Sequence, residues 1–76
     1  MDRLYDLVLG TVESRYDTET RDRFVRWLGS VSPTVGHLAV MMTEMALAGR
    51  CIGRQAVTLL GFTPEGEPII DLRAVR

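Results

Sequence analysis

Hydrophobic side chains recur at helical spacing through the earlier part of the chain and at strand spacing in the later part. Steps of three and four residues between apolar positions predict helices over residues 2–16, 18–29 and 33–48. Two runs rich in β-branched residues, 56–63 and 68–75, predict the arms of an antiparallel β-hairpin. The pattern predicts an α+β fold in which one domain of 76 residues packs three helices against a C-terminal hairpin.

Short local signals indicate where two of these helices begin and end. Ser32 and Pro33 form a start signal, because serine caps free backbone N–H groups and proline suits the first helical position. Gly29 and Gly49 follow the second and third apolar patterns, where a glycine in the left-handed conformation commonly ends a helix. We therefore expect the second helix to stop at Gly29 and the third at Gly49.

The turn of the predicted hairpin lies at residues 63–67. Pro64 has the fixed dihedral that suits the first central position of a type I turn, and Gly66 supplies the left-handed residue of the bulge that follows. On the returning strand the charged residues Asp71 and Arg73 alternate with apolar residues. This alternation predicts one wet face and one buried face.

The predicted third helix is apolar on most of its circumference. One apolar stripe contains Val35, Leu38, Met42 and Met45. The polar residues Thr34, His37 and Glu44 form only a narrow line. We expect this helix to be nearly surrounded, either at the centre of the monomer or at a dimer interface, and the sequence favours neither arrangement.

Composition says little about the partner. Apolar residues make up 46% of the chain, which favours a folded domain over a disordered one. Nine basic residues, all arginine, against ten acidic residues give a formal net charge of −1. No overall attraction to nucleic acid or to anionic membranes is therefore expected. Arginine without lysine is typical of a GC-rich bacterial or phage genome.

No combination of side chains matches a catalytic, nucleotide-binding or metal-binding signature. The glycines do not form a phosphate-binding loop. A single cysteine and a single histidine supply neither a disulfide nor a metal cage. Cys51 has no base to activate it and is predicted to be a small core residue. The sequence therefore predicts a protein that is not an enzyme and uses no cofactor or metal.

No segment has the properties of a membrane span or a secretion signal. The longest weakly polar run, residues 35–48, is shorter than the roughly 20 residues that a span needs. Acidic residues at positions 2, 6 and 13 interrupt the beginning of the chain, where a secretion signal would be basic and then apolar. We expect a cytoplasmic protein without membrane contact.

Residues 52–61, with the sequence Ile-Gly-Arg-Gln-Ala-Val-Thr-Leu-Leu-Gly, resemble the recognition helix of bacterial helix-turn-helix regulators. The resemblance implies a helix over residues 53–61 and a hairpin reduced to the wing of a winged helix-turn-helix. It also implies that Arg54, Gln55 and Thr58 face the DNA groove, where arginine suits guanine and glutamine suits adenine. The β-branched residues of the segment and the turn that follows favour a strand instead.

Two functions are consistent with these patterns. The first is a small non-enzymatic regulatory or inhibitory protein, derived from a phage or mobile element, that binds another protein and forms a homodimer through the third helix. The second is a DNA-binding transcriptional regulator. The residues expected to contact the nucleic acid, or under the first function a protein partner, are Arg50, Arg54, Gln55, Thr58 and Arg73. Extended backbone at residues 53–61 favours the first function, and helical backbone favours the second.

Overall fold

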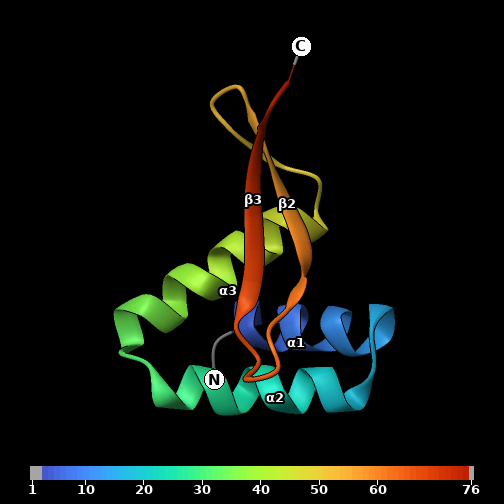
Figure 1. Cartoon of the computed structure of the whole chain (residues 1–76), viewed down its shortest axis with the longest axis vertical. Coiled ribbons are helices and arrows are strands. Elements are labelled where there is room, and N and C mark those ends of the chain that lie inside the picture. Colours follow the sequence, from blue (N-terminus) through green and yellow to red (C-terminus); the bar gives the residue numbers. More distant parts are fainter. Residues whose placement is uncertain (1–2, 76) are drawn as a thin grey trace.

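The computed structural model describes residues 3–75 and contains three helices followed by a three-stranded antiparallel sheet. In chain order the elements are α1 (Arg3–Arg15), α2 (Thr18–Ser30), α3 (Pro33–Leu47), β1 (Cys51–Ile52), β2 (Gln55–Phe62) and β3 (Pro68–Ala74). Strand β2 lies between β1 and β3. Figure 1 shows the β2–β3 turn beside α2, while the opposite end of the sheet projects beyond the helices. The predicted α+β fold is confirmed.

The observed elements begin and end within one residue of their expected bounds, and residue 2 lies outside the described part of the chain. The sheet has one strand more than expected. Strand β1 pairs with the start of β2, Cys51 with Ala56 and Ile52 with Gln55. Two residues are too few to show the alternation of a strand in the sequence, so the pattern did not predict β1.

Helix α2 ends one residue after the predicted stop, but the left-handed conformation predicted for Gly29 is wrong. Gly29 lies inside α2, which continues to Ser30, and Val31 then leaves the helix in an extended conformation with φ −107°. Only Val31 and Ser32 separate α2 from α3, so the chain enters the next helix without a left-handed residue. Ser32 caps α3 as predicted, because its Oγ accepts a hydrogen bond from the Val35 N–H at 3.2 Å.

The predicted stop of the third helix at Gly49 is confirmed. Gly49 has a φ of 69°. The Arg50 N–H donates to the Met45 carbonyl at 2.8 Å, and the Gly49 N–H donates to the Ala46 carbonyl at 3.2 Å. These are the two bonds of a Schellman motif, which satisfies carbonyl groups at a helix end.

The core lies among the three helices and is extended by residues of the hairpin. Its fully buried apolar side chains are Val8, Val12, Phe24 and Val40. Phe62, at the end of β2, packs against this cluster, with its ring centroid 5.2 Å from that of Phe24. The ring of Tyr16 meets Phe62 edge-on at a centroid distance of 5.4 Å. The turn end of the hairpin is therefore anchored in the helical core.

The hairpin turn adopts the predicted conformation and touches α2. The Gly66 N–H donates to the Thr63 carbonyl at 2.9 Å, and Gly66 has a φ of 98°. A Cβ atom on Gly66 would overlap the backbone carbonyl of Arg23 and lie 2.8 Å from the Phe24 nitrogen. Gly66 therefore meets two requirements, a positive φ and close approach to the backbone of α2.

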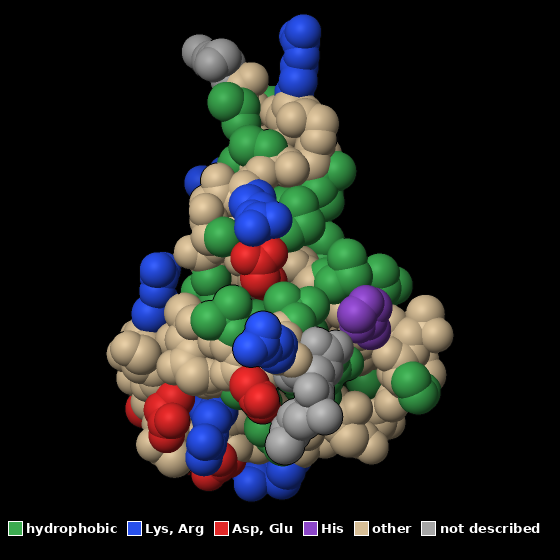
Figure 2. All heavy atoms as spheres, turned by 180° about the vertical axis from the view of Figure 1, so that it is seen from behind, with side chains coloured by type: hydrophobic (Ala, Val, Ile, Leu, Met, Phe, Trp, Pro, Cys, Tyr) green, Lys and Arg blue, Asp and Glu red, His purple; other side chains and the backbone are tan. Residues whose placement is uncertain are grey.

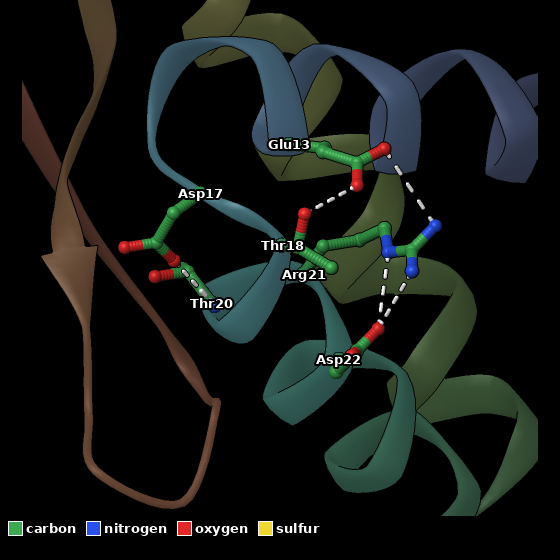
Figure 3. A network of polar contacts seen from close by, with 6 residues as sticks. All are labelled: Glu13, Asp17, Thr18, Thr20, Arg21 and Asp22. Carbon is green, nitrogen blue, oxygen red and sulfur yellow. Dashed lines mark hydrogen bonds and ion pairs between the residues drawn. The ribbon is translucent and has the colours of Figure 1, made fainter.

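Polar side chains connect α1 to α2 at the turn between them (Figure 3). Glu13 of α1 accepts a hydrogen bond from the Thr18 hydroxyl at 2.7 Å and lies 3.7 Å from the Arg21 guanidinium. Arg21 also donates two hydrogen bonds to Asp22, at 2.8 and 3.1 Å. These contacts are partly exposed, so they orient the two helices more than they stabilise them.

The carboxyl group of Asp17 caps α2, and this makes stability depend on pH. Thr20 holds the pKa of Asp17 below its ordinary value of 3.8, through hydrogen bonds from its side chain and from its backbone N–H at 2.7 Å. The charge of Arg23 lowers this pKa further. The unfolded chain therefore takes up a proton at higher pH than the folded chain. The resulting stability is present above pH 3.8 and is lost as the pH falls through the folded pKa.

An Asp17→Asn variant tests this dependence, because asparagine keeps a capping oxygen but does not titrate. We expect its melting temperature to fall less on acidification than that of the wild type, in melts followed by circular dichroism from about pH 7 to about pH 2. Equal losses in the two proteins would contradict the role given to Asp17.

Candidate interaction surface

Helix α3 has two apolar sides, and the monomer buries only one of them. The buried side carries Gly36, Val40 and Thr43. The opposite side carries Val35, Leu38, Met41, Met42 and Met45, which we call the α3 face. Leu38 is 54% exposed and Val35 46% exposed, while Met42 and Met45 are half-buried. The four predicted interface residues lie together with Met41. Of the two arrangements expected for α3, burial at the centre of the monomer is wrong, and the dimer interface stays a prediction.

Small side chains explain which side of α3 faces the domain. A Cβ on Gly36 would lie 3.6 Å from a methyl group of Leu28, which is ordinary van der Waals contact, so this side of α3 faces α2. Thr43 is fully buried, and its hydroxyl donates to the Ala39 carbonyl at 2.7 Å. Gly36 has no side chain, and the Thr43 hydroxyl has its hydrogen bond within the helix, so both residues can pack against the rest of the domain. The bulkier residues of α3 consequently lie on the outer side.

The sheet continues the apolar surface beside α3. Val57 of β2 pairs with Leu72 of β3, so both side chains lie on the same face of the sheet. Val57 is buried, which identifies this face as the one covered by helices, yet Leu72 is 42% exposed. The predicted burial of this face is therefore only partial, because the sheet projects beyond the helices. Helix α3 packs against β3, the strand that carries Leu72, and Figure 2 shows hydrophobic side chains along α3 and the sheet.

The structure separates the residues expected to contact DNA. Thr58 and Arg73 belong to the face of the sheet opposite Val57, whereas Gln55 belongs to the same face as Val57. Arg54 lies in the turn between β1 and β2. The guanidinium of Arg73 lies 2.7 Å from the Asp71 carboxylate. These four side chains are therefore divided between the two faces of the sheet and the β1–β2 turn, so they do not form one contact surface.

Arg50, the fifth residue expected to contact DNA, precedes β1 and lies near a carboxylate of α3. Its guanidinium is 3.7 Å from the Glu44 carboxylate. The alternative helix over residues 53–61 is wrong, because Gln55–Phe62 is a strand paired with β3. This ladder satisfies backbone groups that a helix would otherwise pair, and the β-branched and aromatic side chains suit the pleated surface. The chain therefore lacks, at this position, the recognition helix that a winged helix-turn-helix fold requires.

The reactive side chains do not gather in the structure. Cys51 is exposed, which corrects its predicted place in the core. It pairs with Ala56, on the sheet face opposite Val57, so its side chain is not covered by the helices. His37 is exposed on α3. Within residues 3–75, no three His, Cys, Asp or Glu side chains are placed to hold a metal ion.

A hollow of about 540 Å³ lies beside β2, on the side away from β3. The end of α1 contributes Arg15 and Tyr16 to its wall, the end of α3 contributes Leu47, and the strand contributes residues Ala56 to Leu59. Sequence reasoning missed this site, because it depends on the short length of β1.

The described helices include none that is both long and apolar enough to cross a membrane. No protein-family model, curated protein or solved structure matches the chain. Evidence on function therefore comes from the arrangement of the chain's own residues.

Proposed function

We propose that this chain is a small non-enzymatic interaction protein that regulates or inhibits another protein and forms a homodimer through the α3 face. The observation that carries the proposal is the exposure of this face, with Val35, Leu38 and Met41 all at least 40% exposed. Apolar side chains gathered on one exposed side of a helix are typical of protein–protein contacts. Methionine is flexible and polarizable, so Met41, Met42 and Met45 could adapt to more than one partner surface.

The size of the domain is compatible with such a dimer. A standard interface buries roughly 800 Å² on each partner, which is about a sixth of the 5117 Å² of accessible surface on this chain. The α3 face offers apolar side chains for the centre of that area, and Leu72 is a further exposed apolar side chain, on β3. A domain of this size buries only about 60% of its unfolded surface, so covering the α3 face would add stability that the monomer lacks.

A Leu38→Arg variant tests the homodimer. Leu38 is the most exposed residue of the α3 face, so a charge there should separate the protomers without disturbing the core. We expect light scattering after size-exclusion chromatography at about 0.1 mM to give the mass of a dimer for the wild type and of a monomer for the variant.

Val25→Arg is the matched control. Val25 is 45% exposed on α2, outside the α3 face, so this variant should remain a dimer. Circular dichroism should give the same helix content for all three proteins. A monomeric wild type at this concentration, or loss of the dimer in Val25→Arg, would contradict pairing through the α3 face.

The proposal places the protein in the cytoplasm, where free thiols are kept reduced. The exposed and unpaired Cys51 is compatible with such a compartment. DNA binding, the other function that the sequence allows, has no observation in its favour, because residues 53 and 54 form a turn and Gln55–Phe62 is a strand.

A further inference from the structure

We propose that the 540 Å³ hollow beside β2 binds an extended peptide segment of a partner protein, which carries a carboxylate and adds a strand to the sheet. This site is separate from the α3 face and does not depend on the homodimer. Its three features are a free strand edge, apolar walls and one cation at its rim.

The free edge of β2 follows from the short length of β1. Strand β1 pairs with Gln55 and Ala56, and the Arg50 carbonyl just before β1 accepts from the Val57 N–H, so in the described sheet this edge of β2 is free only from Thr58 onward. Four consecutive residues, Ala56 to Leu59, line the hollow. Because side chains alternate between the two faces, a hollow that touches four residues in a row lies along the edge of the strand.

The backbone groups at this edge suit strand addition. The Val57 N–H points to this side of β2, since it donates to the Arg50 carbonyl at 3.1 Å. Alternation along the strand places the Leu59 N–H on the same side, and the β-bulge between Leu59 and Gly61 ends the regular edge there. Thr58 pairs with Asp71 on the other side. An extended peptide could therefore pair with Leu59 as a new antiparallel or parallel strand.

Charge favours a peptide with a carboxylate. Arg15 is the one charged side chain among the described residues that line the hollow, and it makes no ion pair within residues 3–75. The end of α1 adds a partial negative charge of about half a unit, which weakens the positive charge of Arg15 without cancelling it. The carbonyls at the end of α3 are already bonded to the Gly49 and Arg50 N–H groups.

Apolar walls would hold the side chains of the same peptide. Tyr16, Ala46 and Leu47 border the hollow on the side facing β2. A volume of 540 Å³ lies within the range of about 300–1,000 Å³ that is typical of ligand sites. The hollow can thus receive one or two apolar side chains while the peptide backbone pairs with β2.

The test uses two blocked peptides of about six residues, in which threonine and valine alternate around one central glutamate or one central glutamine. Each is titrated into the ¹⁵N-labelled full chain. We expect amide shifts at Val57 to Leu59 and a shift of the Arg15 side-chain Nε–H, with the glutamine peptide binding about three- to tenfold more weakly.

An Arg15→Gln variant should bind the two peptides equally, whereas Arg26→Gln should behave as the wild type. Arg26 is a matched control because it is exposed on α2 and does not line the hollow. Unshifted amides at Ala56 to Leu59 with about 2 mM peptide, or shifts centred on the α3 face, would overturn the site. Equal binding of both peptides by the wild type would overturn the carboxylate. The titration is repeated in Leu38→Arg, so loss of the homodimer and loss of this site are observed separately.

Discussion

A Gly66→Ala variant should lose about 3 kcal/mol or more of its free energy of unfolding. The alanine Cβ would overlap the backbone carbonyl of Arg23, and neither backbone can relieve the overlap by a side-chain rotation. The positive φ of 98° adds a second cost. To escape both, the hairpin turn would have to leave α2, and Phe62 would lose its contacts in the core. Urea unfolding followed by circular dichroism measures the loss.

Gly53→Ala is the control for Gly66→Ala. Gly53 also has a positive φ, of 58°, but a Cβ atom there meets nothing within 4 Å. This variant should lose only about 1–2 kcal/mol, the cost of a left-handed conformation for alanine. If both variants lost the same free energy, the contact between the hairpin turn and α2 would be disproved.

A Phe24→Ala variant should lose about 3–5 kcal/mol of its free energy of unfolding. Phe24 is fully buried, with ring centroids 5.2 Å from Phe62 and 6.4 Å from Trp27. Truncation therefore leaves a cavity where α2 meets the hairpin. Domains of this length have total stabilities of about 4–11 kcal/mol, so the variant should lose between about a quarter and all of its stability. Urea unfolding followed by the fluorescence of Trp27, the chain's one tryptophan, measures the effect.

Val25→Ala is the control for Phe24→Ala, because Val25 is the next residue of α2 and is 45% exposed. Its free energy of unfolding should change by no more than about 0.5 kcal/mol. Similar midpoints for the two variants would show that the core is not centred on Phe24.

Local chemistry explains how much of the fold could be predicted from the sequence. The start of α3 at Ser32, its stop at Gly49 and the turn around Gly66 each rest on hydrogen bonds or dihedrals that a few neighbouring residues determine. Strand β1 has a weaker signal, a glycine at Gly53 in the first position of a two-residue loop. Such a loop is a hairpin signal, but strand β1 is too short to show the alternation of side chains that would support it.

The two candidate surfaces depend on tertiary packing, which explains why only part of them could be predicted. An apolar pattern all round α3 identified Leu38 and Met42 as interface residues but could not show which side the monomer buries. In the structure, Gly36, Val40 and Thr43 form the buried side. The hollow beside β2 was not predictable at all, because Arg15 and Leu59 are far apart in sequence and meet only when α1 reaches the strand edge.

The sheet is held unequally along its length, and this affects how tightly a partner can bind. At the β2–β3 turn, Phe62 and Gly66 contact the helices, whereas the end that includes β1 has exposed residues and a two-residue ladder. Few buried contacts mean a low free energy of local opening, so the projecting end fluctuates more than the anchored end. A partner that binds the projecting end must order it, and the loss of conformational entropy lowers the affinity of the complex. Substitutions that stiffen the β1–β2 turn would then tighten binding without touching the partner.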